Sequence, residues 1–202
     1  FGRTKIVADF RRVLADRGFV EGEGPTMQTI AGGAAARPFI THHNTLDIDL
    51  YLRIALELHL KRLLVGGMER VFELGRVFRN EGISRKHNPE FTMLEAYQAY
   101  GDYHAMMDLT EALFTGAIEA VGGGFQRPWG EPTIDWTPPW PRRSYAELFQ
   151  EHVGVALSDV EGVRGMAGNH QINPVGKDHV VLVGELFEER VEPSLIGPVF
   201  VI

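Results

Sequence analysis

Two side chains that could bind a cation lie two residues apart in the segment from residue 91 to residue 100. The segment has the composition of a strand, and strand side chains alternate between faces, so Glu95 and Tyr97 share one face. If that face is covered, the carboxylate needs a partner, because an unpaired buried carboxylate is costly or takes up a proton. A cationic ligand would satisfy it. Taken alone, the pattern favours a structural role, in which Glu95 pairs with an internal arginine and Tyr97 packs in the core.

The polar stretch before this strand is rich in groups that bind phosphate. Arg79 precedes the stretch at the end of another expected strand. An arginine at a strand end is held more firmly than one in a loop, so it suits the charge that develops on a transferring phosphoryl group. A solvated turn with a few surface ion pairs explains the same composition. The stretch also contains Asn80, Glu81, Arg85, Lys86, His87 and Asn88.

Hydrophobic periodicity predicts the elements that would position these groups. Helix-breaking glycines follow two of the helical patterns, at Gly18 and at residues 66–67, and Asp102 has the chemistry of an N-cap. Ser144 and Ser158 each precede a glutamate by three residues, the spacing of a capping box. The predicted helices span residues 3–17, 56–64, 103–121 and 181–191, and the predicted strands span 46–52, 70–79 and 91–100.

The strand from residue 46 shows alternation of apolar and polar side chains, which predicts a half-buried strand with Asp47, Asp49, Tyr51 and Arg53 on its polar side. The residues 80–90 are too many for a tight turn between the two later strands. Helices gathered around antiparallel strands, without a repeating strand–helix–strand pattern, predict an α+β fold: an antiparallel β-sheet flanked by helices.

The composition excludes several classes of protein. The 202 residues are 44% hydrophobic and 23% charged, which is typical of globular domains and excludes wholesale disorder. A net charge of −7 argues against a general basic surface for nucleic acid but allows a local basic patch. There are no cysteines, so disulfides, thiolate zinc sites and a cysteine nucleophile are excluded. The histidines lack paired metal-ligand spacing, and we predict no metal site within the chain.

Longer motifs carry a resemblance to a known family. Phe78-Arg79-Asn80-Glu81-Gly82, followed by residues 87–95 (HNPEFTMLE), resembles motif 2 of the class II aminoacyl-tRNA synthetases in its lysyl form. Residues 32–44 (GGAAARPFITHHN) resemble the segment that separates the lysine enzymes from their aspartate and asparagine relatives, and Pro25 resembles the motif 1 proline. The resemblance covers most of residues 1–121 and resumes weakly at 184–200. It favours the ligand-binding interpretations over the structural ones.

The resemblance implies a role for each site residue. Arg79 would be catalytic, contacting the α-phosphate of ATP and the carboxylate of lysine. Glu81 would contact the adenine amino group, and Phe91 would stack on the ring. Glu95 and Tyr97 would bind the ε-ammonium of lysine. The implied ATP-binding residues are Arg79, Asn80, Glu81, His87, Asn88 and Phe91, and the implied lysine-binding residues are Gly33, Glu57, Glu95 and Tyr97.

The resemblance also implies a reaction and partners. Lysine would be activated by ATP to lysyl-adenylate and transferred to tRNA(Lys) by a cytoplasmic homodimer, formed through the motif 1 region and without a membrane partner. Residues 1–202 would be a partial class II catalytic domain. We find neither motif 3 nor the N-terminal anticodon-binding OB-fold in them, and we expect the Mg²⁺ ligands beyond residue 202.

Two alternatives stay open at the level of sequence. A synthetase paralogue could use the same adenylation site to pass lysine to a protein, such as elongation factor P, or to a lipid pathway. A catalytically silent truncated relative could bind a partner through its motif 1 surface. Lysine-dependent exchange of pyrophosphate into ATP separates the silent relative from the enzymes.

Overall fold

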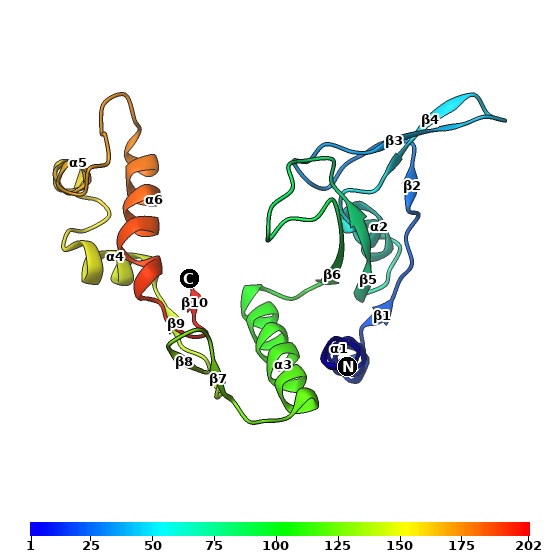
Figure 1. Cartoon of the computed structure of the whole chain (residues 1–202), viewed down its shortest axis with the longest axis horizontal. Coiled ribbons are helices and arrows are strands. Elements are labelled where there is room, and N and C mark those ends of the chain that lie inside the picture. Colours follow the sequence, from blue (N-terminus) through cyan, green and yellow to red (C-terminus); the bar gives the residue numbers. More distant parts are fainter. The chain divides into compact units, whose positions relative to one another are not determined.

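The computed structural model covers all 202 residues, which divide into two compact units. One unit is Val7–Met106, and the other combines Phe1–Ile6 with Met107–Ile202. Figure 1 shows that the first unit contains the longest strands, whereas the second contains a group of helices at the C-terminal end of the chain.

The Val7–Met106 unit is built on a long pair of antiparallel strands. β5 (Arg70–Phe78) and β6 (Glu90–Gln98) pair along their full lengths, from Arg70 opposite Gln98 to Phe78 opposite Glu90. β1 (Val20–Glu21) extends this sheet as a parallel neighbour of β5. The two predicted strands are therefore confirmed with ends shifted by one or two residues, and the polar stretch forms the loop between them.

One face of this strand pair is covered by α2 (Glu57–Val65). Leucines four residues apart lie on one side of the helix and pack onto alternate residues of the two strands. Side chains four residues apart share a helix face, and every second side chain shares a strand face. The buried residues of this core are Leu56, Leu60, Val71 and Val77, with Phe91, Met93 and Tyr97 packed against them. Phe91 and Tyr97 share a face with Glu95, so the face predicted to bind a cation is the covered one.

A second, smaller sheet has the order β2 (Met27–Gln28), β4 (Ile48–Leu52) and β3 (Ile40–His43), all antiparallel. The predicted strand 46–52 is confirmed at its end, but its start and the expected exposure of Arg53 are wrong. Leu46 is 63% exposed and Asp47 has a positive φ of 50° in the hairpin turn, so the strand begins at Ile48. Arg53, expected on the polar side, is only 5% exposed because a buried carboxylate from another strand holds it.

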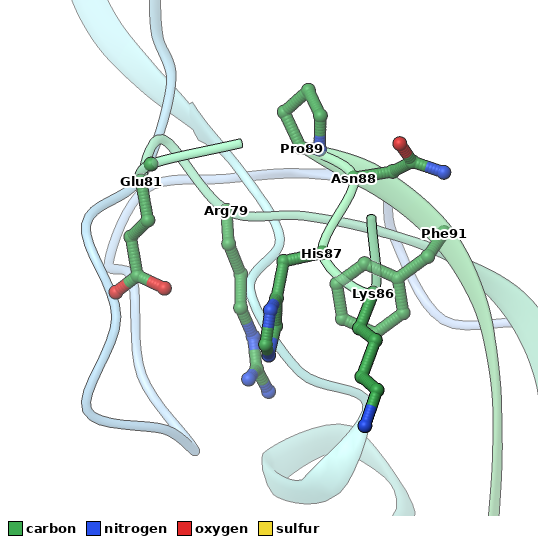
Figure 2. A pocket seen from close by; sticks show the side chains of 8 residues that line it. Arg79, Glu81, Lys86, His87, Asn88, Pro89 and Phe91 are labelled. Carbon is green, nitrogen blue, oxygen red and sulfur yellow. The ribbon is translucent and has the colours of Figure 1, made fainter. Parts of the chain in front are cut away.

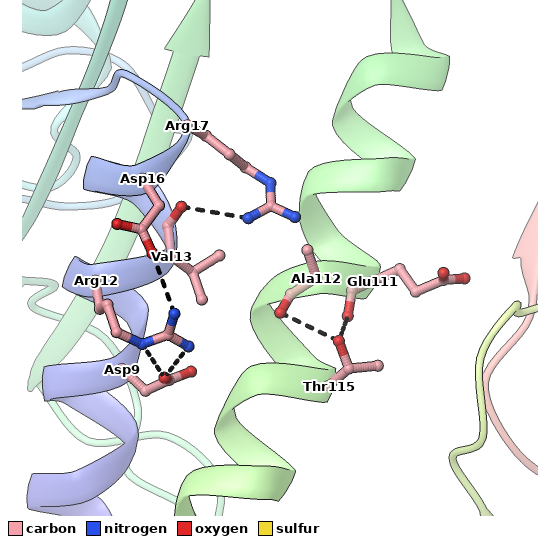
Figure 3. A network of polar contacts seen from close by, with 8 residues as sticks. All are labelled: Asp9, Arg12, Val13, Asp16, Arg17, Glu111, Ala112 and Thr115. Atoms are coloured by element: carbon pink, nitrogen blue, oxygen red, sulfur yellow. Dashed lines mark hydrogen bonds and ion pairs between the residues drawn. The ribbon is translucent and has the colours of Figure 1, made fainter.

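Two long helices agree with their predicted bounds. α1 (Gly2–Asp16) ends before Gly18, whose φ of +77° is the left-handed conformation that glycine adopts most easily. On α1, Arg12 donates hydrogen bonds to both Asp9 and Asp16 (Figure 3). α3 (Tyr103–Val121) is capped by Asp102, which accepts a hydrogen bond from the Ala105 amide at 3.2 Å. Within α3, the Thr115 hydroxyl donates to the carbonyl of Glu111 (Figure 3).

The C-terminal part of the second unit is a helical core formed by α4 (Tyr145–Val153), α5 (Val160–Asn169) and α6 (His179–Arg190). Ser144 caps α4 as predicted, but the prediction for Ser158 is wrong. Asp159 is the residue immediately before the first helical turn of α5, and its carboxylate accepts from the Gly162 amide at 2.9 Å. The core residues are Leu148, Phe149, Val153, Val163, Ala167, Leu182, Leu186, Phe187 and Val191.

Short strands complete the second unit. β7 (Gln126–Pro128) and β8 (Thr133–Asp135) form an antiparallel hairpin, and β9 (Arg142–Arg143) pairs in parallel with β10 (Phe200–Val201). A single 3-10 turn, Glu192–Ser194, follows α6. None of the helices combines the length and the apolar character needed to cross a bilayer. Helices together with mainly antiparallel sheets confirm the predicted α+β class.

Candidate active site

A pocket of about 310 Å³ lies where β5 ends and β6 begins (Figure 2). It combines cationic and hydrogen-bonding side chains with one carboxylate and one aromatic ring, a set that can bind a phosphorylated ligand with a flat ring. The side chains of Arg79, Glu81, Lys86 and His87 extend in one direction from the loop, while the Asn88 amide points away from them. The lining residues are Arg79, Glu81, Gly82, Lys86, His87, Asn88, Pro89 and Phe91.

Arg79 is held at the end of β5 by three contacts. Its backbone amide donates to the Pro89 carbonyl at 2.8 Å, and its Nε donates to the Ile54 carbonyl at 3.3 Å. Its guanidinium carbon lies 5.3 Å from the centre of the Phe91 ring, within the range of a cation–π contact. The two terminal nitrogens make no hydrogen bond within the chain, so they can bind an anion in the pocket.

The loop between the strands closes on itself at its tip. Ser84 and His87 exchange two backbone hydrogen bonds of 3.1 and 3.2 Å, and the Ser84 hydroxyl lies 2.8 Å from Nδ1 of His87. Asn80 is the one member of the predicted ATP set that does not line the pocket. Its backbone amide donates to the Arg37 carbonyl at 2.8 Å. This hydrogen bond ties the loop to residues 32–44, the glycine-rich segment.

The carboxylate of Glu95 is held by two neutral donors. Its Oε1 accepts from the Leu56 amide at 3.1 Å, and its Oε2 accepts from the Tyr97 hydroxyl at 2.8 Å. No lysine, arginine or histidine of the chain forms an ion pair with it. The alternative of an internal arginine partner for Glu95 is therefore wrong, and this half-buried carboxylate is without a cation.

The hydroxyl of Tyr97 stays protonated and so remains a hydrogen-bond donor to the Glu95 carboxylate. Burial, the hydrogen bond to Glu95 and the negative charges of Glu95 and Glu57 all raise the pKa of Tyr97 above the usual value of a tyrosine. The phenol therefore keeps its proton at neutral and mildly alkaline pH. The charge of Glu57 contributes to the raised pKa of Tyr97. A second carboxylate therefore interacts electrostatically with Tyr97, in addition to Glu95.

The glycine-rich segment lies against the start of α2. Gly33 has a φ of +89°, and a Cβ added there would lie 3.1 Å from the Ala55 Cβ and 3.2 Å from the Glu57 Cβ. A side chain at this position would strain the backbone and crowd the helix, so glycine is the residue that fits. Gly33 and Glu57 are thus neighbours, as the lysine-binding prediction requires.

Lys61 is a cation that the sequence reasoning missed. Its Nζ donates to the Glu57 carboxylate at 2.5 Å and lies 5.8 Å from the centre of the Tyr97 ring. The signal was available, because a glutamate four residues before a lysine on a helix is the favoured orientation of an ion pair. The side chain of Lys61 is 54% exposed, so this ion pair is a surface one.

A buried ion pair beneath the site was also missed. Arg53 and Glu73 are 5% and 4% exposed, and Nη1 of Arg53 donates to Oε1 of Glu73 at 2.5 Å. Arg53 also donates to the carbonyls of Gly24 and Arg76, at 3.0 and 2.8 Å. Gly75 leaves room for the guanidinium, because a Cβ there would collide with it. Glu73 stands directly opposite Glu95 in the strand pair.

This ion pair anchors the short segment 53–57, which holds both parts of the site. The carbonyl of Ile54 accepts from Arg79 on the pocket side, and the amide of Leu56 donates to Glu95 on the other side. The backbone carbonyl of Arg53 accepts from the Phe78 amide at 2.9 Å. Arg79 and the unpaired carboxylate of Glu95 are therefore both held by hydrogen bonds to segment 53–57.

The chain does not gather a metal-binding group of side chains. No cluster of three or more histidine, aspartate or glutamate residues is arranged to hold an ion. Glu81 is the sole carboxylate that lines the pocket. The residues present therefore do not fit a magnesium site by themselves.

Comparison with known proteins agrees with this geometry. The profile of the class II tRNA synthetases (D, K and N) matches residues 2–185. The chain is 55% identical over 206 residues to the lysine–tRNA ligase of Moorella thermoacetica, covering 99% of this chain and 42% of that protein. It is 52% identical over 205 residues to the enzyme of that name from Listeria monocytogenes, covering 98% and 41%. For the enzyme from Dehalococcoides mccartyi, identity is 48% over 203 residues, covering 98% and 41%.

The chain therefore spans about two fifths of the length of these curated relatives. The profile match covers more than half of the chain and includes both strands of the site and the loop between them. On these findings, the chain belongs to the class II tRNA synthetases of the D, K and N group.

Proposed function

We propose that the protein carrying this chain is a lysine–tRNA ligase, which activates lysine with ATP and transfers it to tRNA(Lys). One observation carries the proposal. Glu95 is a half-buried carboxylate without a cation, and it lies on the same sheet face as Phe91, whose ring Arg79 covers. A site for an ammonium group next to a site for phosphate is the combination that lysine activation requires. The names of the relatives support the same reaction.

The adenylation step uses the pocket at the end of β5. A carboxylate oxygen of lysine attacks the α-phosphorus of ATP, and pyrophosphate leaves from the opposite side. Arg79 stabilises the negative charge that builds on the phosphoryl oxygens, and its fixed position avoids reorganisation during the reaction. Phe91 provides a surface for the adenine ring, and Glu81 accepts a hydrogen bond from its amino group. His87 and Asn88 support the nucleotide, and Asn80 acts indirectly by fixing the loop.

Recognition of lysine uses the carboxylates near α2. Glu95 and Tyr97 bind the ε-ammonium, while Glu57 and the backbone at Gly33 bind the α-ammonium. Removing one partner of a buried, hydrogen-bonded charge pair costs about 2–5 kcal/mol, so an amino acid without a distal cation is rejected roughly 30-fold to several thousand-fold. Ornithine and arginine carry a cation and are separated by the length of the pocket.

The second step and its partners follow from the same assignment. The 3′-terminal hydroxyl of tRNA(Lys) attacks the lysyl carbonyl, and AMP leaves. We propose that residues 1–202 are part of one catalytic domain, acting in the cytoplasm as a homodimer. The apolar side chains of Met27 and Ile40, which are 57% and 63% exposed on the small sheet, support a protein partner in the motif 1 region.

Magnesium accompanies ATP in enzymes of this kind, but the carboxylates of this chain do not make a site for it. We expect its ligands outside residues 1–202, and no step above depends on it.

The test is lysine-dependent exchange of pyrophosphate into ATP, followed by charging of tRNA(Lys), with the full-length protein. Exchange that requires lysine, together with charging, supports the proposal. Exchange without charging would favour an enzyme that passes lysine to another acceptor. Absence of both would contradict the assignment and favour a silent relative.

A further inference from the structure

The loop between β5 and β6 contains a hydroxyl–imidazole contact to which the proposed reaction assigns no role. The Ser84 Oγ lies 2.8 Å from Nδ1 of His87, and the two residues are also joined by a pair of backbone hydrogen bonds. His87 lines the pocket, whereas Ser84 does not. The side chain of Ser84 therefore reaches the pocket through hydrogen-bond partners that line it, the His87 ring and the Lys86 amide.

The hydrogen bonds around Ser84 leave its hydroxyl proton able to donate to His87. The Ser84 oxygen accepts from the Lys86 amide at 3.2 Å. The hydroxyl proton has a single acceptor in the chain, Nδ1 of His87. When the hydroxyl donates to Nδ1, the proton of the neutral imidazole must be on Nε2.

The position of that proton decides whether His87 attracts or repels an anion. With the proton on Nε2, the neutral ring can donate a hydrogen bond to a phosphate oxygen. With the proton on Nδ1, the ring presents a lone pair at Nε2, which repels the same oxygen. A serine that fixes the tautomer thus makes a neutral histidine a phosphate donor, without requiring the ring to be charged.

We propose that Ser84 is a positioning residue that holds His87 as the neutral Nε2–H tautomer, so that the ring donates to a phosphate oxygen of the bound nucleotide. The inference deepens the proposed function and rests on nucleotide binding in this pocket. The charged groups that line the pocket with His87 are Arg79 at the end of β5, and Glu81 and Lys86 in the loop. Ser84 determines which ring nitrogen of His87 carries the proton, and it does not change the charges of Arg79, Glu81 and Lys86.

The tautomer is tested first, in the full-length protein without nucleotide. Nitrogen-15 NMR of the histidine rings distinguishes a protonated from an unprotonated ring nitrogen, and the His87→Gln variant assigns the signals. We expect Nε2 to be protonated and Nδ1 to be unprotonated at pH 8.5. A proton on Nδ1 would overturn the inference and would leave the proposed function untouched.

The consequence for binding is tested with ATP as the probe, by equilibrium titration at pH 8.5. Loss of one net hydrogen bond predicts that Ser84→Ala weakens ATP binding roughly 2- to 12-fold at pH 8.5. Ser84→Thr keeps the hydroxyl and should restore the binding.

Controls separate this role from a structural one. Ser158→Ala removes an exposed serine that does not cap α5, and it should not change ATP binding at any pH. In a His87→Ala background, Ser84→Ala should have no further effect on ATP binding. A loss on Ser84→Ala that is the same in the His87→Ala background as in the unchanged protein would assign Ser84 to the loop backbone alone and contradict the inference. Failure of every variant and of the unchanged protein to bind ATP would contradict the proposed function instead.

Discussion

Two carboxylates that face each other across the β5–β6 pair have different surroundings. The region around Glu73 is closed, because Arg53 pairs with it and the backbone of Gly24 donates a further hydrogen bond. The region around Glu95 is half-buried, and the carboxylate is held only by the Leu56 amide and the Tyr97 hydroxyl. Both positions lie on the face that α2 covers, so burial by the helix does not explain the difference.

The difference separates a charge that stabilises the fold from one that is available to a ligand. The Arg53–Glu73 pair is complete within the chain, and an added cation would have no place there. Neutral donors orient the Glu95 carboxylate without cancelling its charge, so a cationic ligand can provide the missing partner. Four substitutions test this comparison.

The largest expected effect is on stability, from Glu73→Gln. The change leaves Arg53 buried without a counter-charge, and breaking a buried ion pair in this way costs about 3–5 kcal/mol. Urea unfolding should show this loss in the free energy of unfolding. Glu95→Gln is the matched control, because no cation depends on Glu95, and its midpoint should change little. An equal loss for both variants would contradict the comparison.

The second effect is on lysine activation, from Glu95→Gln. Loss of the charge that pairs with the ε-ammonium should raise the activation free energy for kcat/KM with lysine by about 2–5 kcal/mol. The value of kcat/KM should therefore fall roughly 30-fold to several thousand-fold. ATP binding should be retained, because Arg79 and the loop are unchanged. Pyrophosphate exchange measured against lysine and against ATP separates the two. Equal losses for both substrates would count against the role of Glu95 in lysine binding.

Tyr97→Phe should have a smaller effect, because it removes one of two donors to a carboxylate that stays in place. A hydrogen bond to a charged group contributes about 1.5–3 kcal/mol, which corresponds to roughly 10- to 100-fold in kcat/KM for lysine.

The raised pKa of Tyr97 adds a pH dependence with a defined sign. The unfolded chain loses this proton near about pH 10, whereas the folded chain keeps it. The stability that Tyr97 contributes is therefore fully present below that pH and is lost as pH rises through the folded pKa. Unfolding measured above pH 10 should show a decline that is shallower in Tyr97→Phe. The same decline in both proteins would rule out this source.

The smallest effect is expected from Lys61→Met, which removes the cation beside Glu57. An exposed i,i+4 ion pair contributes about 0.3–0.5 kcal/mol. The free energy of unfolding should therefore change by no more than about this amount, and the KM for lysine by no more than about twofold. Urea unfolding and pyrophosphate exchange measure the two quantities. A large rise in the KM for lysine would show that Lys61 takes a direct part in lysine binding. That result would contradict the assignment of Lys61 to a surface ion pair with Glu57.

Much of the architecture could be predicted because it depends on local patterns. The apolar patterns of residues 70–79 and 91–100 predicted β5 and β6, and leucine spacing with terminal glycines predicted α2. The errors have a common origin, since the features involved depend on neighbours distant in sequence. Arg53 belongs to the polar side of an alternating strand, yet it is buried because Glu73, 20 residues later, requires a cation. Asp159 in place of Ser158 reflects a helix end displaced by one residue, which periodicity does not resolve.

For the candidate site, the order of residues specifies which chemical groups are present and which of them share a strand face. Period-two geometry is enough to put Glu95 and Tyr97 together, and the motif is enough to name Arg79, Glu81 and His87. Three features depend on the folded chain: Glu73 and not Glu95 receives an internal cation, Asn80 lies outside the pocket, and the segment 53–57 holds both halves of the site. The physical reason is that a strand pattern specifies the face of a side chain, whereas its partners come from segments that only folding brings near.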